Sequence, residues 1–141
     1  MILESRSKWY ELMQWKNVIW KDKCPFCPEL AETDEEKKLK IWETKYWKII
    51  HNKFPYADLE NHLLVVPKRH VENTKDLKDE EFIELRNVEE FMSEYYWDQN
   101  YFSFIRETNW WKSIKHLHYH FLPWILYSTH LEKSLIRQDL K

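Results

Sequence analysis

The sequence contains no glycine in 141 residues, whereas ordinary proteins contain about 7%. Glycine adopts positive φ angles without steric cost, so such turns here must use asparagine, aspartate or a strained residue. The chain is rich in tryptophan instead, with nine residues. One of these, Trp97, follows a predicted helix and precedes a predicted strand, where glycine would be natural. We therefore expect backbone strain where the chain has to reverse direction.

Three histidines alternate with apolar residues near the end of the chain. His116, His118 and His120 are separated by Leu117 and Tyr119, and Phe121 follows them. Successive side chains of a strand point to opposite faces, so a strand over 114–122, ended by a proline, places all three imidazoles on one face. The alternative is a polar sheet edge or a set of structural histidines.

The remaining pattern predicts strands around one long helix. Apolar residues that are mostly three to four apart predict an amphipathic helix that Asn73 or Thr74 can cap. Its apolar positions are Leu77, Phe82, Leu85, Val88, Phe91 and Met92. The predicted strands are 42–51 (as one strand or a hairpin), 62–66 and 101–106, and a short helix is predicted over 5–15. The charged run 33–40 is expected to be a solvated loop or helix face. Without regular βαβ alternation, the class is α+β with a mostly antiparallel sheet.

Charge and composition exclude several classes of protein. The 22 basic and 24 acidic residues give a net charge of −2, which makes no strong case for nucleic-acid binding. No apolar run reaches the length of a membrane span, and the N-terminus lacks the apolar region of a signal peptide. We expect no membrane partner and a cytoplasmic protein. The length suits one domain over residues 1–141.

Two cysteines, Cys24 and Cys27, have the spacing C-x-x-C. Two cysteines do not make a disulfide framework, so a metal site or a redox pair fits the spacing better. Redox catalysis is disfavoured because no thioredoxin-like βαβ pattern surrounds the pair. A metal-free, buried pair of thiols is the remaining alternative.

Four motifs together resemble the histidine triad (HIT) family of nucleotide hydrolases and transferases, in family order over about residues 24–124. The motifs are Cys24-Pro-Phe-Cys27, Asn52-Lys-Phe-Pro55, His62-Leu-Leu-Val-Val-Pro67-Lys-Arg-His70 and Ser113-Ile-Lys-His116-Leu-His118-Tyr-His120-Phe-Leu-Pro123. The resemblance implies a HIT-like α+β fold with a mostly antiparallel five-stranded sheet, one long helix and a short N-terminal helix. It also implies a homodimer.

The resemblance assigns roles to individual residues. His118 would be the nucleophile that forms a covalent nucleotidyl-histidine, with His120 and His62 completing the catalytic cluster. Neutral imidazole suits this role because its unperturbed pKa is about 6.5. Ser113 would contact phosphate, and Asn52 would bind the ribose of a purine nucleotide, although Asn52 is nearly as well explained as a turn residue. Lys112 replaces a glutamine common in the family and would neutralise phosphate charge. The loop 52–62 is about two residues longer than the family pattern.

A structural zinc site is also implied by the resemblance. Some branches of the family pair the C-x-x-C motif with two distant histidines, as in galactose-1-phosphate uridylyltransferases. The ligands here would then be Cys24, Cys27, His70 and His116, a closed tetrahedral set that the chemical step does not require. His51 and His130 are interpreted as surface or satisfied histidines.

Several tryptophans occupy positions where the family commonly has glycine. Trp110 or Trp111 precedes Ser113, and Trp124 follows Pro123. We hypothesise that the organism places glycine at some of these sites by reading a UGA codon as glycine. The alternative is a glycine-free, aromatic-rich domain.

The sequence therefore favours an enzyme that cleaves a nucleoside phosphoramidate or a phosphoanhydride of the diadenosine polyphosphate type. A non-catalytic, zinc-stabilised module that binds nucleotides or a protein is the alternative. A DNA-end repair hydrolase of the same superfamily is disfavoured by the near-neutral charge and the missing finger extension.

Overall fold

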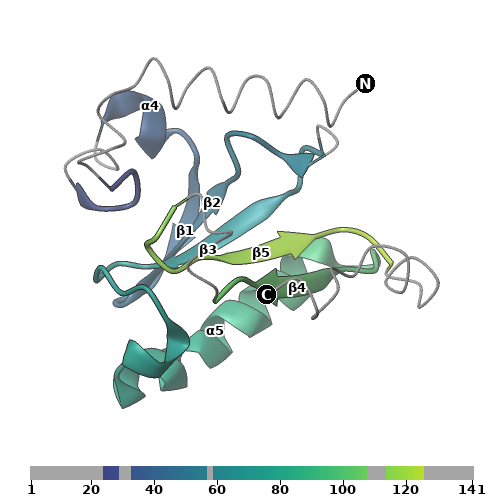
Figure 1. Cartoon of the computed structure of the whole chain (residues 1–141). Coiled ribbons are helices and arrows are strands. Elements are labelled where there is room, and N and C mark those ends of the chain that lie inside the picture. The colour runs from purple at the N-terminus through teal and green to yellow at the C-terminus, as the bar shows by residue number, and fades with distance from the viewer. Residues whose placement is uncertain (1–23, 29–32, 57–58, 108–113, 126–141) are drawn as a thin grey trace, which may run out of the picture.

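The computed structural model describes residues 24–28, 33–56, 59–107 and 114–125, and the helix expected over 5–15 lies outside this part of the chain. The described residues form one five-stranded antiparallel sheet in the order β1-β2-β3-β5-β4 (Figure 1). The elements are α4 (Asp34–Lys37), β1 (Lys40–Glu43), β2 (Trp47–His51), β3 (Leu63–Pro67), η2 (Thr74–Asp76), α5 (Asp79–Tyr96), β4 (Phe102–Ile105) and β5 (Tyr119–Leu122). The α+β prediction is confirmed.

The segment 42–51 forms a hairpin rather than a single strand. Strands β1 and β2 pair antiparallel, and the Thr44 backbone N–H donates to the Trp47 carbonyl across the turn at 2.8 Å. The Thr44 hydroxyl in turn accepts from the Trp47 backbone N–H at 3.0 Å. A local side-chain bond of this kind closes the turn without glycine. The charged run 33–40 contains the single turn α4, which Thr33 caps through its hydroxyl.

The predicted start of the long helix at Asn73 or Thr74 is wrong. Asn73 only precedes the short 3-10 helix η2, and its side chain makes no capping bond. The chain is extended again at Leu77, and α5 begins at Asp79. Glu81 stabilises the helix start at this position, because its carboxylate accepts a hydrogen bond from the backbone N–H of Lys78 at 2.8 Å. The capping pattern that determines the helix start therefore lies about four residues later than the first Asn-Thr pair.

The predicted strand over 114–122 is shorter than expected. Only Tyr119–Leu122 forms β5, and β3 pairs with it from Leu63 to Val65. The ladder stops there because Pro67 has no N–H, and its carbonyl accepts from the His116 ring rather than from a backbone group. β3 begins one residue after His62, and β4 is one residue shorter at each end than the predicted 101–106.

Two apolar clusters cover opposite faces of the sheet. Between α5 and the sheet lies the larger cluster, which includes Trp47, Ile49, Leu63, Val65, Val88, Met92, Leu117 and Phe121. The other face carries a smaller cluster of Phe26, Ile50, Leu64 and Val66. All five residues of β3 are buried, so its alternate side chains serve both clusters. The histidine-bearing face is the one that the smaller cluster covers.

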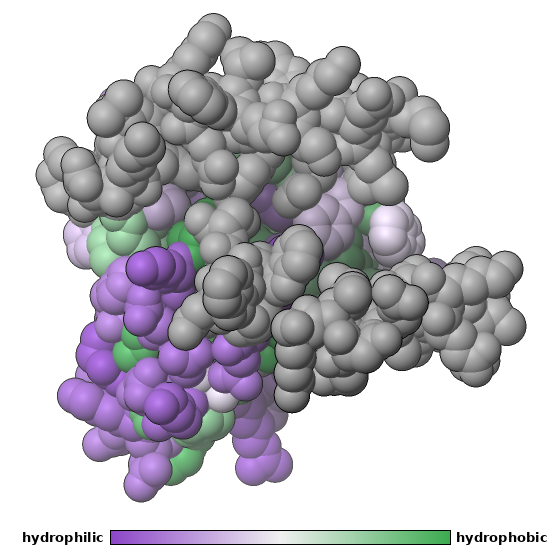
Figure 2. All heavy atoms as spheres, in the orientation of Figure 1, coloured by the Kyte–Doolittle hydropathy of each residue, from purple (hydrophilic) through white to green (hydrophobic). Residues whose placement is uncertain are grey.

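The outer face of α5 is polar. Figure 2 shows mainly hydrophilic residues over the lower part of the molecule, where α5 and η2 lie, with a few hydrophobic side chains between them. Two hydrophobic residues of α5, Phe82 and Ile83, are exposed. No helix in the described ranges is long and apolar enough to cross a membrane.

Candidate functional site

His62 and His120 form a buried pair at the centre of the sheet. His120 lies on β5 opposite Leu64 of β3, and His62 immediately precedes β3. The two rings approach with His62 Nε2 2.9 Å from His120 Nδ1. Both side chains are almost completely buried. A contact this short between two ring nitrogens requires one to donate and the other to accept.

A backbone group fixes which nitrogen donates. The Tyr56 N–H donates to His62 Nδ1 at 3.0 Å, so Nδ1 accepts and the proton of neutral His62 lies on Nε2. His62 Nε2–H then donates to His120 Nδ1. Neutral His120 consequently carries its proton on Nε2, where it can act as a donor toward a bound group.

His118 lies beside His120, with the two ring centroids 5.0 Å apart. Its Nδ1 is 2.8 Å from the carbonyl oxygen of His116. A carbonyl oxygen only accepts, so Nδ1 carries the proton and the imidazole lone pair lies on Nε2. Phe26 packs against the same ring at a centroid distance of 5.4 Å. The backbone thus holds His118 in the tautomer that leaves Nε2 as the basic and nucleophilic atom.

His116 belongs to a second group with Cys24, Cys27 and His70, although it is only two residues from His118. One ligand atom from each of the four residues lies within 4.8 Å of the others. His116 Nδ1 is 3.3 Å from Cys24 Sγ, 3.6 Å from Cys27 Sγ and 3.1 Å from His70 Nδ1. Cys27 Sγ is 3.3 Å from His70 Nδ1. The four residues could therefore hold a metal ion.

The tautomer of His116 is also fixed. Its Nε2–H donates to the Pro67 carbonyl at 2.7 Å, which leaves the Nδ1 lone pair directed at the cysteines. Burial lowers the pKa of His116 to about 4, so its imidazole is neutral at pH 7. The pKa of Cys27 is raised to about 11, first by burial and then by Cys24. A raised thiol pKa is the opposite of what a redox-active cysteine shows.

Asn52 makes the contacts of a turn residue. Its side-chain oxygen accepts from the Phe54 backbone N–H at 2.9 Å, which is an Asx turn. Its amide nitrogen lies 3.3 Å from the His62 ring nitrogens. The residue is therefore next to His62, and its side-chain oxygen is engaged by the backbone. Lys112 and Ser113 lie outside the described residues.

Several residues at the site were not predicted from the sequence. Tyr56 and Phe104 pack against the His62–His120 pair, and Arg106 contacts Tyr56. Phe26 contacts both His116 and His118. Phe104 could have been considered from the sequence, because it lies on the predicted strand 101–106. In the structure its register partner is His120. No sequence signal pointed to Tyr56, because it lies in the loop whose length departs from the family pattern.

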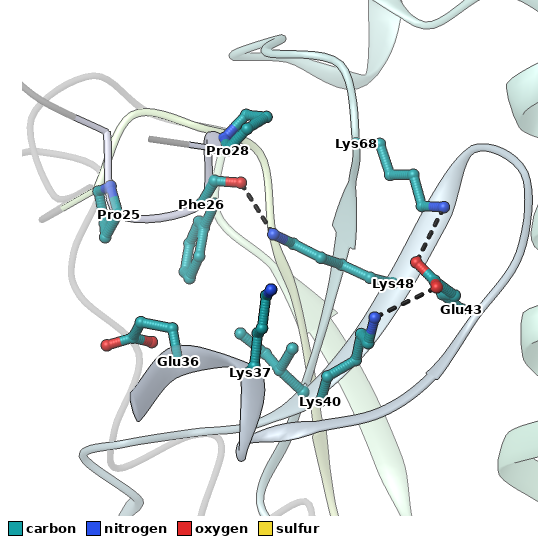
Figure 3. A pocket seen from close by; sticks show the side chains of 10 residues that line it. Pro25, Phe26, Pro28, Glu36, Lys37, Lys40, Glu43, Lys48 and Lys68 are labelled. Carbon is teal, nitrogen blue, oxygen red and sulfur yellow. Dashed lines mark hydrogen bonds and ion pairs between the residues drawn. The ribbon is translucent and has the colours of Figure 1, made fainter. Parts of the chain in front are cut away.

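Phe26 also lines a lysine-rich cavity of about 160 Å³ (Figure 3). It is lined by Lys37, Lys40, Lys48, Lys68, Glu36, Glu43, Ile50 and three residues of the C-x-x-C knuckle, Pro25, Phe26 and Pro28. Lys48 donates to the Phe26 carbonyl at 2.9 Å, and Glu43 pairs with both Lys40 and Lys68. Lys48 thus anchors the knuckle from the sheet.

Known proteins with this fold are similar to the chain at low sequence identity. Diadenosine triphosphate hydrolase of Plasmodium falciparum superposes with a TM-score of 0.55 at 22% identity, covering 64% of this chain and 63% of that chain. A HIT family member of Bacillus subtilis gives 0.55 at 18% identity, over 83% of this chain and 100% of that chain. A zinc-bound histidine triad family protein of Mycobacterium smegmatis gives 0.55 at 19% identity, over 69% and 73%.

The chain thus spans less than two thirds of the Plasmodium protein's length. No curated protein sequence matches the chain significantly. The profile of the HIT domain matches residues 33–124, which is more than half of the chain. The chain therefore belongs to the HIT domain family.

Proposed function

We propose that the protein is a nucleotidyl hydrolase or transferase that cleaves a purine nucleoside phosphoramidate or phosphoanhydride through a covalent nucleotidyl-histidine on His118. The observation that carries this proposal is the 2.8 Å contact from His118 Nδ1 to the His116 carbonyl. It leaves the lone pair on Nε2 and orients the ring at no cost during the reaction. Membership of the HIT family and the fold shared with a diadenosine triphosphate hydrolase support it.

The chemistry proceeds in two displacements. His118 Nε2 attacks the α-phosphorus, a phosphorus–nitrogen bond forms, and the bond to the leaving group breaks. His120 Nε2, which the contact with His62 leaves protonated, donates a hydrogen bond to the phosphate or to the leaving group, and the leaving group takes its proton from solvent. Water then attacks the phosphorus and the phosphorus–nitrogen bond breaks. The nucleoside monophosphate departs, the second proton of the water returns to solvent, and neutral His118 is regenerated. Asn52, Lys112 and Ser113 complete this proposal as residues that bind the nucleotide.

Zinc is the metal that suits the Cys24, Cys27, His70 and His116 group. In a tetrahedron with bonds of about 2.0 Å to nitrogen and 2.3 Å to sulfur, neighbouring ligand atoms lie about 3.3–3.8 Å apart. The four contacts of 3.1–3.6 Å lie within about 0.2 Å of such edges. All four ligand atoms lie within 4.8 Å of one another. Bound there, zinc would link the C-x-x-C knuckle to the segment that presents His118, and it would leave no position open for water. Its role in this proposal is structural.

The assembly and cellular setting of the enzyme extend the proposal. We expect a homodimer that acts on purine nucleotides in the cytoplasm. Neither membrane nor nucleic acid enters this proposal as a partner.

The deciding experiment measures AMP release by zinc-loaded protein from adenosine 5′-phosphoramidate and, in parallel, from a diadenosine polyphosphate. His118→Ala should abolish turnover on both, while His51→Ala should retain it. His51 is a suitable control because its ring contacts the Glu60 carbonyl at the end of β2 and it belongs to neither histidine group. Nucleotide binding without turnover by the folded wild-type protein would instead establish a binding module. The ratio of the two rates assigns the leaving group.

A further inference from the structure

We propose that Tyr56 and Arg106 form a clamp that positions the His62–His120 pair so that His120 Nε2–H can donate a hydrogen bond to the reacting group. This inference rests on the proposed function, since it concerns how His120 is held in that reaction. Tyr56 contacts the pair through two separate groups. Its backbone N–H donates to His62 Nδ1 at 3.0 Å, and its ring lies 4.6 Å from the His62 ring and 5.4 Å from the His120 ring.

The His120 ring lies among nearly parallel aromatic rings. Phe104 is 4.5 Å from it between centroids with an interplanar angle of 4°, and Tyr56 makes an angle of 18° with it. Tyr56 and Phe104 are themselves 6.2 Å apart at 16°. Parallel packing on this scale restricts rotation of the imidazole, so its Nε2 keeps one direction. The orientation of His120 is therefore set from outside the histidine cluster.

Arg106 connects these rings on the outer side. Its guanidinium donates to the Tyr56 hydroxyl at 2.8 Å, and its Cζ lies 5.9 Å from the Phe104 ring centroid. Arg106 directly follows β4, where the Phe104–His120 register pair lies. The Arg106 side chain thus links the loop residue Tyr56 to the edge of the sheet across 50 positions of sequence.

The consequence is a defined order of hydrogen bonds. Arg106 holds the Tyr56 ring, and the Tyr56 backbone N–H holds His62 Nδ1 as an acceptor. His62 Nε2–H then donates to His120 Nδ1, which keeps the proton of His120 on Nε2 as a hydrogen-bond donor. Tyr56 and Arg106 are positioning residues, because they act on the reaction through His62 and His120.

The test compares Tyr56→Phe and Arg106→Leu with the wild type in steady-state kinetics and in imidazole ¹⁵N NMR. Tyr56→Phe keeps the ring and the backbone N–H, so the fold is preserved while the link to Arg106 is lost. We expect kcat of both Tyr56→Phe and Arg106→Leu to fall about tenfold with KM changed less than about twofold, since a misplaced hydrogen-bond donor weakens only the transition state. Arg106→Lys, which retains a donor, should recover most of kcat.

Tyr95→Phe is the matched control. It removes a phenolic hydrogen bond of the same 2.8 Å length, made to Asn61 rather than to Arg106. Its kcat should stay at the wild-type value. Equal losses of kcat in Tyr95→Phe and Tyr56→Phe would overturn the clamp, as would wild-type kcat in both Tyr56→Phe and Arg106→Leu.

The NMR measurement separates this inference from the proposed function. The ¹⁵N shifts of the wild type should report Nε2-protonated His62 and His120, with exchange between tautomers appearing in Arg106→Leu. This holds even for a protein without turnover on either nucleotide. A single unchanged tautomer in Arg106→Leu would overturn the clamp, whereas failure of the His118→Ala comparison would overturn only the enzymatic proposal.

Discussion

The two ends of α5 each involve a tryptophan, and the two tryptophans are used in opposite ways. At the N-terminal end, Trp47 of β2 is completely buried, and its indole N–H donates to the Glu81 carbonyl at 2.8 Å. At the C-terminal end, Trp97 is 83% exposed and has a φ of 48°, the single positive φ among the described non-glycine residues. At the first end the tryptophan side chain is buried and hydrogen-bonded, whereas at the second a bulky side chain stands on a backbone conformation that favours glycine.

The first end shows how a side chain and its surroundings support each other. The Glu81 carboxylate accepts from the Lys78 backbone and from Arg69, while the Glu81 carbonyl accepts from Trp47. Acidic residues in the first turn also suit the positive end of the helix dipole. At the second end, the Trp97 backbone N–H donates to the Ser93 carbonyl at 3.2 Å, while the Trp97 side chain is exposed. A bulky residue thus occupies a position whose backbone favours glycine.

Replacing Trp47 should give the largest loss of stability in this comparison. Trp47→Ala removes a fully buried indole, together with the indole N–H that donates to the Glu81 carbonyl. We expect the free energy of unfolding to fall by about 3–5 kcal/mol, as for other buried tryptophans, measured by denaturant titration. Trp97→Ala is the control and should cost less than about 0.5 kcal/mol, because its side chain is solvated. Similar losses at both positions would contradict the distinction.

Glu81→Gln should produce the next largest effect, and its effect should depend on pH. Burial acts to raise the pKa of Glu81, but the hydrogen bonds from Arg69 and Lys78 outweigh it and lower the pKa below the ordinary 4.5. A lowered pKa stabilises the fold above the unfolded value and loses that contribution as the pH falls through the folded value. At pH 7 we expect a loss of about 2 kcal/mol, typical of a hydrogen bond to a charged group.

The difference between Glu81→Gln and the wild type should shrink as the pH falls below about 4.5, where the carboxylate of the unfolded chain becomes protonated. Unfolding titrations at pH 7 and at pH 3 measure both values. A difference that stays constant over this range would show that packing, rather than the charge of Glu81, stabilises this end of the helix.

The two ends of α5 also differ in how well they can be read from the sequence. The apolar periodicity predicts the helix itself, because one face must pack on the sheet. The sequence places the start too early, since Asn73 and Thr74 look like caps. The structure instead directs Thr74 to the Glu107 carboxylate, and Glu81 caps the helix. Such a choice depends on a partner 33 residues away and is invisible to a local pattern.

At the candidate site, the histidines and cysteines could be predicted from the sequence, but the neighbouring residues that hold them in place could not. The alternation of His116, His118 and His120 marks three imidazoles, but the structure places His116 with Cys24, Cys27 and His70, while His118 lies beside His120. The four proposed metal ligands were named from a motif resemblance, and the structure brings them together. By contrast, the contact of Tyr56 with His62 arises from the path of an irregular loop, which no periodicity encodes.

Trp97→Gly should stabilise the protein, with the smallest effect in this comparison. A non-glycine residue at positive φ is strained by about 1–2 kcal/mol, and the exposed indole contributes little burial to offset this. Glycine adds conformational freedom to the unfolded chain, so we expect a net gain of about 1 kcal/mol in the free energy of unfolding. A matched thermal scan should show a higher Tm than the wild type.

Trp124→Gly is the control, because Trp124 lacks a positive φ and is only 39% exposed. It should lower stability by about 1 kcal/mol through lost apolar burial, so the two glycine substitutions should have opposite signs. Position 97 therefore gives the most direct test of the hypothesis that a reassigned codon encodes glycine. The hypothesis requires a UGA codon at Trp97 and glycine at that position in the peptide from native cells, while Trp47 should be encoded by UGG. A UGG codon at 97, or a loss of stability in Trp97→Gly, would show that the chain accepts tryptophan there despite its backbone.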